Sequence, residues 1–166
     1  MVVFDASTLI LLAKIDMLDV FVTNFPGRIL IPEKVQSESC IRGREEALII
    51  KTLIGDGTIA VVKIKDRKQR EKIMDDFSID QGEADALLLV LQEKAVLIAT
   101  DDRNAIRACK ALKIDFITAI AILVRAFEKG LIEKDEALAK LTKLESIARY
   151  NRAIIEDARK RIEGGK

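Results

Sequence analysis

The chain has 166 residues, a length that suits one domain with its own hydrophobic core. Hydrophobic residues make up 49% and charged residues 33%, which is the balance of a folded chain and excludes a disordered one. The 28 basic residues nearly equal the 27 acidic ones, so net charge gives no support to nucleic-acid binding. The absence of histidine excludes Ser-His-Asp triads, Cys-His pairs and histidine-ligated zinc.

The start of the chain and the cysteines favour a cytoplasmic location. The apolar first residues are interrupted at Asp5 and no basic segment precedes them, so they do not resemble a signal peptide. No apolar run approaches the ~18 residues needed to cross a membrane. Cys40 and Cys109 lie far apart and outside any CxxC motif, and we expect both to be reduced.

Short apolar runs alternate with helical patterns along the first half of the chain. A helix started by Pro32 suits the preference of proline for the first turn, and Gly55-Asp56-Gly57 is a stop and turn signal. In chain order the pattern predicts a strand at 2–4, helices after Asp5 and from about 16 to 23, a strand at 28–31, helices from Pro32 and at 45–54, and a strand at 58–64.

The second half continues the alternation and ends in helices. It predicts a helix at 66–76, a strongly apolar helix at 83–93 opened by Gln81-Gly82, a strand at 95–99, a helix from 102 to 112, a strand at 115–118, and two or three amphipathic helices between 119 and 162, broken at Gly130 and near Tyr150. Strands that are apolar throughout and alternate with helices are typical of a parallel sheet covered on both faces. We therefore predict an α/β fold, a three-layer α/β/α domain over residues 1–130, with residues 131–166 as a helical C-terminal extension packed on it.

Acidic residues gather where the predicted strands end. Asp5 follows the first strand, and Asp101 and Asp102 follow the strand at 95–99. Sites in open α/β sheets form beyond the carboxyl ends of the strands, so these acids are predicted to share one edge. The acids of interest, including those on two helices, are Asp5, Glu38, Glu83, Asp85, Asp101 and Asp102.

Each acid also has a structural explanation. Asp5 and Asp102 suit helix N-caps, acids in the first turn after Gly82 are favoured by the helix dipole, and Glu38 suits a solvated surface. Taken together, carboxylates around one edge repel each other unless a cation neutralises them. Mg²⁺ prefers oxygen ligands and binds through few carboxylates plus water and substrate phosphate. Without histidine as a base, a metal-activated water is the predicted nucleophile.

Four segments, in order, resemble the PIN-domain family, which includes the ribonuclease toxins of prokaryotic toxin–antitoxin pairs. They are VVFDASTLI, IPEKVQSE, GEADALLLV and VLIATDDRNAIRACKAL. The GEADA element and the later ITAIAILVRAFEKGLI are similar to a subgroup common in archaea and bacteria. The resemblance covers about residues 1–130 and, more loosely, the helical tail. It implies a PIN-like nuclease domain that hydrolyses RNA phosphodiester bonds, leaves a 5′ phosphate and binds one or two Mg²⁺ or Mn²⁺ ions.

By position, the resemblance implies four catalytic and metal-binding acids: Asp5, Glu38, Asp85 and Asp102. Glu83 and Asp85 project about 200° apart on a helix, so both cannot face one metal directly. Asp85 is preferred because it aligns with the family's acid before an Ala-Leu-rich helix, with Glu83 in reserve. Asp102 is likewise preferred, with Asp101 in reserve. Ser7 and Thr100 are predicted to orient the carboxylates or water through their hydroxyl groups.

An RNA substrate also requires positive charge along its backbone. Arg103, Arg107 and Lys110 follow Asp102 at helical spacing and are the first candidates, although such a stripe is more often simply solvated. Further candidates are Lys14 and residues 42–44, which include two arginines. With six Phe, one Tyr and no Trp, a base-stacking surface is poorly supported.

The resemblance further implies a homodimer and a protein antitoxin as partner. The alternative is a catalytically inactive PIN-like domain that binds protein or RNA, and metal binding discriminates between the two. A phosphatase-like or nucleotide-binding α/β protein is not supported, because GxxxxGK[ST] and GxGxxG are both missing. The sequence leaves open a toxin or a housekeeping enzyme of RNA processing.

Overall fold

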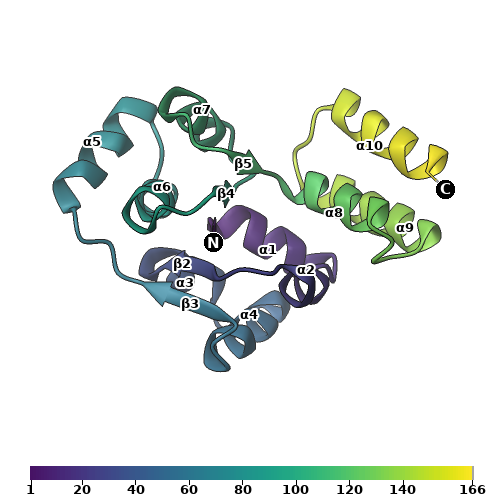
Figure 1. Cartoon of the computed structure of the whole chain (residues 1–166), viewed down its shortest axis with the longest axis horizontal. Coiled ribbons are helices and arrows are strands. Elements are labelled where there is room, and N and C mark those ends of the chain that lie inside the picture. The colour runs from purple at the N-terminus through teal and green to yellow at the C-terminus, as the bar shows by residue number, and fades with distance from the viewer. Residues whose placement is uncertain (166) are drawn as a thin grey trace.

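The computed structural model describes residues 1–165, and a five-stranded parallel sheet forms its centre (Figure 1). The strand order is β3-β2-β1-β4-β5, so the first strand in the chain is the middle strand of the sheet. The predicted three-layer α/β/α fold is confirmed. The strands are β1 (Val2–Phe4), β2 (Ile29–Pro32), β3 (Ile59–Val62), β4 (Leu97–Ala99) and β5 (Phe116–Ile117).

Ten helices connect and cover these strands within residues 1–165. Each predicted helical segment contains an observed helix, and the tail holds three. The helices are α1 (Ala6–Lys14), α2 (Leu18–Asn24), α3 (Glu33–Ser39), α4 (Glu45–Gly55), α5 (Arg67–Phe77), α6 (Gln81–Glu93), α7 (Arg103–Leu112), α8 (Ala119–Glu128), α9 (Lys134–Ile147) and α10 (Arg152–Gly164). None of the helices formed by the described residues has the length and hydrophobicity of a membrane span.

Two hydrophobic cores lie on opposite faces of the sheet. Successive side chains of a strand point to opposite faces, so Val2 and Phe4 enter one core and Val3 enters the other. The first core is shared with α1, α4 and α8, and the second with α5, α6 and α7. Burial on both faces explains why β1 is apolar throughout.

The C-terminal helices complete the first core. Leu141 and Leu144 of α9 and Ile155 of α10 are buried in the same cluster as Phe4. Figure 1 shows α8, α9 and α10 grouped at one end of the molecule. Lys166, the last residue of the predicted extension, lies outside the described residues. Cys40 and Cys109 are both free, as expected, and Cys109 is buried.

Candidate active site

Asp5 lies at the carboxyl end of β1 and caps α1. Its Oδ1 accepts hydrogen bonds from Ser7 Oγ at 2.6 Å and from the Thr8 N–H at 3.2 Å, and its Oδ2 accepts one from the Thr100 hydroxyl. The pairing of β1 with β4 sets Asp5 beside Thr100, because Phe4 and Ala99 are partners in the register. The side chain is almost fully buried, and this burial raises its pKa to about 6.

Asp102 follows β4 and caps α7. Its Oδ1 accepts hydrogen bonds from the N–H groups of Asn104 and Ala105, both at 2.8 Å. Its Oδ2 accepts no hydrogen bond from residues 1–165 and remains available to a ligand. The capping role and a ligand-binding role are therefore compatible, since each uses a different oxygen.

Asp101, the reserve candidate, points toward α8 and the C-terminal helices. It accepts hydrogen bonds from the Thr8 hydroxyl at 2.6 Å, from the Ala119 N–H at 3.0 Å and from the Tyr150 hydroxyl. The Tyr150 oxygen in turn accepts the N–H of Ile120 at 3.2 Å. Burial raises the pKa of both Asp101 and Tyr150. Asp101 therefore joins three parts of the chain together, and its acceptor positions are largely used.

Sequence reasoning did not single out Tyr150. It lies between α9 and α10, and its approach to Asp101 depends on the path of the chain through three helices. Its position at a predicted helix break, as the one tyrosine of the chain, was the only signal.

Glu83, in the first turn of α6, faces the acids of β1 and β4. Its N–H donates to Asp80 Oδ1, and its Oε2 accepts from the Asp80 N–H, both at 2.9 Å. This capping box fixes the start of the helix. Burial, together with the negative charges of Asp80, Asp102 and Asp5, raises the pKa of Glu83 to about 7. Glu83 therefore belongs electrostatically with Asp5 and Asp102.

A cleft of about 640 Å³ opens beside these acids. Its position at the carboxyl ends of β1 and β4 is where ligand sites form in open α/β sheets. The polar side chains that line it are Ser7, Glu83, Asp101, Asp102, Arg103, Asn104, Arg149 and Tyr150.

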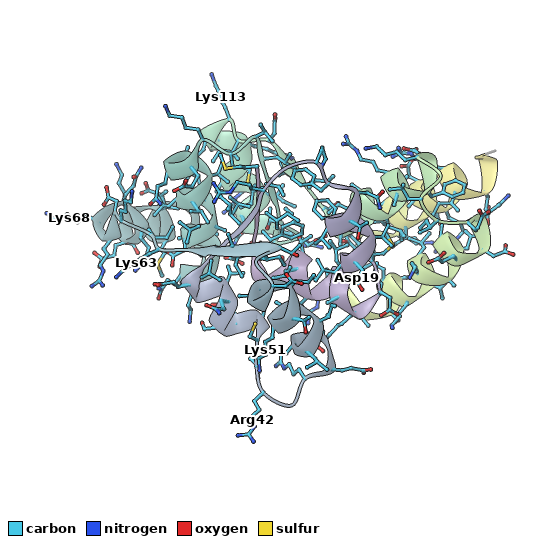
Figure 2. All side chains as sticks on the ribbon, turned by 60° about the horizontal axis from the view of Figure 1, so that its bottom comes forward. Asp19, Arg42, Lys51, Lys63, Lys68 and Lys113 are labelled. Carbon is cyan, nitrogen blue, oxygen red and sulfur yellow. The ribbon has the colours of Figure 1, made fainter. Side chains whose placement is uncertain are left out.

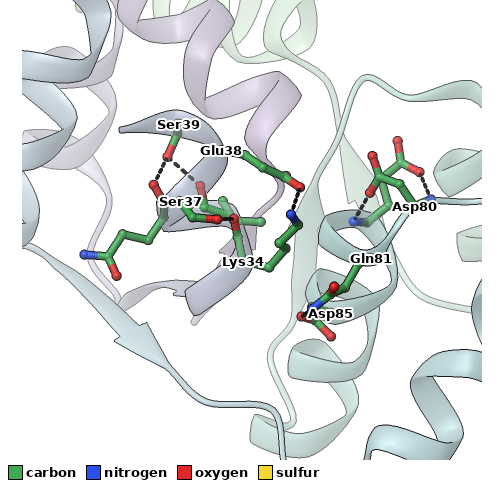
Figure 3. A network of polar contacts seen from close by, with 10 residues as sticks. Lys34, Ser37, Glu38, Ser39, Asp80, Gln81 and Asp85 are labelled. Carbon is green, nitrogen blue, oxygen red and sulfur yellow. Dashed lines mark hydrogen bonds and ion pairs between the residues drawn. The ribbon is translucent and has the colours of Figure 1, made fainter. Parts of the chain in front are cut away.

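Asp85, the preferred candidate on α6, lies on a different side of that helix. It is 1% exposed, and its Oδ1 accepts a hydrogen bond from Arg70 Nε of α5 in a buried ion pair. Its Oδ2 lies 3.5 Å from Gln81 Nε2. Figure 3 shows Asp85 next to Gln81, one turn along the helix from Asp80. Asp85 lines a separate cavity and does not border the cleft that Glu83 lines.

Glu38 lies on α3 and rests on the first turn of α6. Its Oε1 forms an ion pair with Lys34 Nζ at 3.5 Å, drawn in Figure 3. A Cβ atom at Gly82 would come within 2.3 Å of Glu38 Oε2, so only glycine lets the carboxylate approach this closely. Burial raises the pKa of Glu38, and the charges of Asp80 and Asp85 add to the effect. Glu38 therefore has Asp80 and Asp85 as its acidic neighbours.

The candidate acids thus form two groups about the start of α6, one around Asp102 and one around Asp85. Within residues 1–165, no three acidic or cysteine side chains stand close enough to enclose a metal ion by themselves. The first group fits an ion that is held by one or two carboxylates and whose remaining ligands are water and phosphate, which is how Mg²⁺ usually binds to proteins. Asp102 offers a free oxygen, and the raised pKa values of Asp5 and Glu83 mark a site that a cation would stabilise.

Among the predicted RNA-binding residues, only Arg103 lines the cleft. Arg107 and Lys110 lie further along the exposed side of α7. Lys14 forms a weak ion pair with Glu46 at 4.0 Å. Figure 2 shows Arg42 extending outward from the loop between α3 and α4. Their contact with RNA stays a prediction.

Comparison with known families agrees with the fold. A model described as a PIN domain matches residues 1–163, which is nearly the whole chain. The protein therefore belongs to the PIN-domain family. PIN domains have a nuclease-like fold and typically bind divalent metals, and the family match includes the C-terminal helices. A search of curated proteins gave no significant match.

Proposed function

We propose that the protein is an endoribonuclease that hydrolyses RNA phosphodiester bonds and depends on Mg²⁺ or Mn²⁺. The observation that carries the proposal is that Glu83 and Asp102 line one open cleft in a nuclease-like fold, with the buried Asp5 close to Glu83. The chain has no histidine, so a carboxylate-held ion is the natural source of a nucleophile.

Asp102, through its free Oδ2, and Glu83 would hold the ion, with Asp5 buried beneath them. When bound, such an ion lowers the pKa of a coordinated water and offsets charge on the phosphate. The hydroxyls of Ser7 and Thr100 keep the Asp5 carboxylate in one orientation. Arg103, at the edge of the cleft, is placed to attract a phosphate of the strand.

The assignment of Glu83 in place of Asp85 departs from the positions that the family resemblance implies. For Glu38 and Asp85 to serve as ligands, they would have to leave their ion pairs with Lys34 and Arg70. Breaking the buried Asp85–Arg70 pair is costly because it leaves a charge without a partner, whereas the Glu38–Lys34 pair is about one third exposed and costs less. Glu83 needs no such exchange, because it already faces Asp102.

The first test is cleavage of a mixed RNA pool in Mn²⁺, Mg²⁺ or EDTA, with wild-type protein and the Asp5→Asn variant. Asparagine keeps the size of the side chain and its ability to cap α1, but removes the charge. We expect cleavage with either metal, none in EDTA, and a loss of about 100-fold in the variant. Asp75→Asn, an exposed acid on α5, is the matched control. Cleavage that persists in EDTA, or that survives Asp5→Asn, would contradict the proposal.

The second candidate function is a PIN-like binding domain without catalysis. The ion pairs of Glu38 with Lys34 and of Asp85 with Arg70 favour this second function. In an inactive domain these two acids are not needed as metal ligands and can serve as ion-pair partners. Calorimetry with Mn²⁺ distinguishes the two functions. A folded protein that neither binds Mn²⁺ nor cleaves RNA is the binding domain.

We also propose, from the family resemblance, that the protein is the toxin of a toxin–antitoxin pair and forms a homodimer. Expression of the wild type in a bacterial host should arrest growth, whereas Asp5→Asn should not. A monomer in light scattering at micromolar concentration would count against the dimer.

A further inference from the structure

A second cavity, rich in positive charge, lies at α5 and α6 and is lined by residues other than those of the cleft. Its volume is about 300 Å³. Four cations and two carboxylates line it, and Lys34 is also paired with Glu38, so a net positive charge remains and the cavity favours an anion. We call it the cationic cavity, and its charged side chains are Glu33, Lys34, Lys63, Arg67, Arg70 and Asp85.

Asp85 holds Arg70 in this cavity. The Asp85 carboxylate is buried, the Arg70 side chain is 19% exposed, and Nε makes the hydrogen bond between them. The Nη1 and Nη2 groups of Arg70 donate no hydrogen bond to residues 1–165. A guanidinium that is anchored through Nε and keeps its outer N–H groups is well prepared to bind a phosphate.

Lys63 and Arg67 add two cations that form no ion pair with the described part of the chain. Gln92 of α6 fixes the loop that carries Lys63: its Nε2 donates to the Lys63 carbonyl at 3.3 Å, and its Oε1 accepts the Lys65 N–H at 3.2 Å. The cavity wall is therefore held by α6 as well as by α5.

The first turn of α5 increases the positive potential. It contains Arg67, Lys68 and Arg70 and no acidic residue, and the Asp66 carboxylate that caps the helix offsets only one of these three charges. Cations in this position repel one another and the helix dipole. An anion bound beside Arg67 and Arg70 would relieve that repulsion.

We propose that the cationic cavity binds a backbone phosphate of the RNA strand, and that Asp85 is the counter-ion that positions Arg70 for this contact. This inference rests on the proposed function, since it concerns the same substrate. The start of α6 carries Gln81 and Asp85 toward the cavity and Glu83 toward the cleft. An RNA strand that crosses the first turn of α6 places one phosphate at the carboxylates of the cleft and another at the cations of the cationic cavity.

The test measures binding of a short, labelled, single-stranded RNA with a 5′ hydroxyl, in EDTA, by fluorescence anisotropy. The Lys63→Gln/Arg67→Gln double variant removes the two cations without an ion-pair partner, so no carboxylate loses its counter-ion. We expect affinity at low salt to fall roughly tenfold and the slope of log affinity against log salt to decrease by about 0.7, the value for one lost phosphate contact. The matched control is Lys72→Gln/Lys143→Gln, which removes the same charge from exposed positions of α5 and α9 outside the cavity.

An equal loss in both double variants would overturn the inference, because only overall charge would then matter. Unchanged binding by the cavity variant would overturn it as well, while metal-dependent cleavage by the wild type would leave the proposed function intact. A loss seen only with RNA that carries a 5′ phosphate would assign the cavity to a strand end and contradict binding of a backbone phosphate.

Asp85→Asn separates the two roles open to this acid. If Asp85 positions Arg70, RNA affinity in EDTA falls while Mn²⁺ affinity in calorimetry stays unchanged. If Asp85 is a metal ligand, Mn²⁺ affinity falls at least tenfold and RNA binding in EDTA is kept. Should this variant fail to fold, the Lys63 and Arg67 double variant decides the question alone.

Discussion

Asp5 combines a structural and a functional position in one side chain. It caps α1, and it lies beneath the cleft with three hydrogen-bond donors around it. Those donors do not fully compensate burial, because the pKa of the carboxyl group is still raised to about 6. A charged Asp5 at neutral pH therefore reduces the stability of the fold when no cation is present.

The stability of the protein in EDTA should consequently carry a pH-dependent contribution from Asp5. A carboxyl group with a raised pKa favours the folded state at low pH, and this contribution is lost as pH rises from about 4 through about 6. The Asp5→Asn variant lacks the contribution. We expect its melting temperature to exceed that of the wild type increasingly from about pH 4 to pH 6 and to level off by pH 8, with a final difference in unfolding free energy on the order of 2–3 kcal/mol.

Differential scanning calorimetry of both proteins across this pH range checks the expectation. Glu83, whose pKa is raised to about 7, contributes in the same direction in both proteins and largely cancels. Added Mn²⁺ should narrow the difference at pH 8, because the ion stabilises the charged wild-type site. A difference that does not vary with pH would show that Asp5 is already charged and stabilised in the fold.

At the same scale, the choice between Glu83 and Asp85 marks the limit of sequence-based prediction. Their separation of two positions already predicted that they point to different sides of α6. Which side meets Asp102 depends on the rotation of the helix, which buried Leu87 helps to set, and on Arg70 from another helix. Neither is visible in the local sequence.

At the scale of the elements, apolar runs and helical spacing predicted every strand and helix of the described residues. The differences between the predicted and the observed elements lie at the ends of those elements. The second helix begins at Leu18 and not near Asp16, because Asp16 adopts a left-handed conformation with φ of 55° and turns the chain. The strand before Thr100 begins at Leu97, two residues later than predicted.

Tyr150 connects the α9–α10 turn to Asp101 at the end of β4. Removing its hydroxyl should therefore affect the position of Asp101 more than it affects metal binding. Tyr150→Phe leaves Asp101 and the Ile120 N–H each without one hydrogen-bond partner. We expect a loss of about 1–3 kcal/mol in unfolding free energy and a moderate decrease in kcat for RNA cleavage. Mn²⁺ affinity should change little, because Asp102 and Glu83 are not in contact with the phenol.

Urea unfolding, cleavage kinetics and Mn²⁺ calorimetry on one preparation test this expectation. Leu131→Ala, a partly exposed residue away from the cleft, serves as a control for general effects. If Tyr150→Phe abolished Mn²⁺ binding, the tyrosine or Asp101 would belong to the ion site itself.

At the scale of the whole molecule, the C-terminal helices are part of the core that supports the cleft. Leu141, Leu144 and Ile155 are buried in the same cluster as Phe4 and Leu9. A chain ending at residue 130 would expose the apolar face of α8 that these side chains cover. We therefore expect residues 1–130 to aggregate or to bind hydrophobic dyes, and to lack a cooperative melting transition.

The milder substitution Leu141→Ala keeps the chain complete and tests the same core. It should lower the unfolding free energy by about 2–5 kcal/mol while the protein stays folded. A soluble chain of residues 1–130 with a cooperative transition would identify residues 131–166 as a true extension, separate from the domain.

The central position of β1 has a consequence for how the protein is made. β1 leaves the ribosome before the other four strands, and β2 follows soon afterwards, but β4 on its other side is formed by residues 97–99. Until then the growing chain has an unpaired strand edge, and Asp5 lacks the hydroxyl of Thr100. Tyr150 arrives still later. The cleft is thus complete only after residue 150 has been made, so a shorter nascent chain lacks part of the site that the proposed nuclease would use.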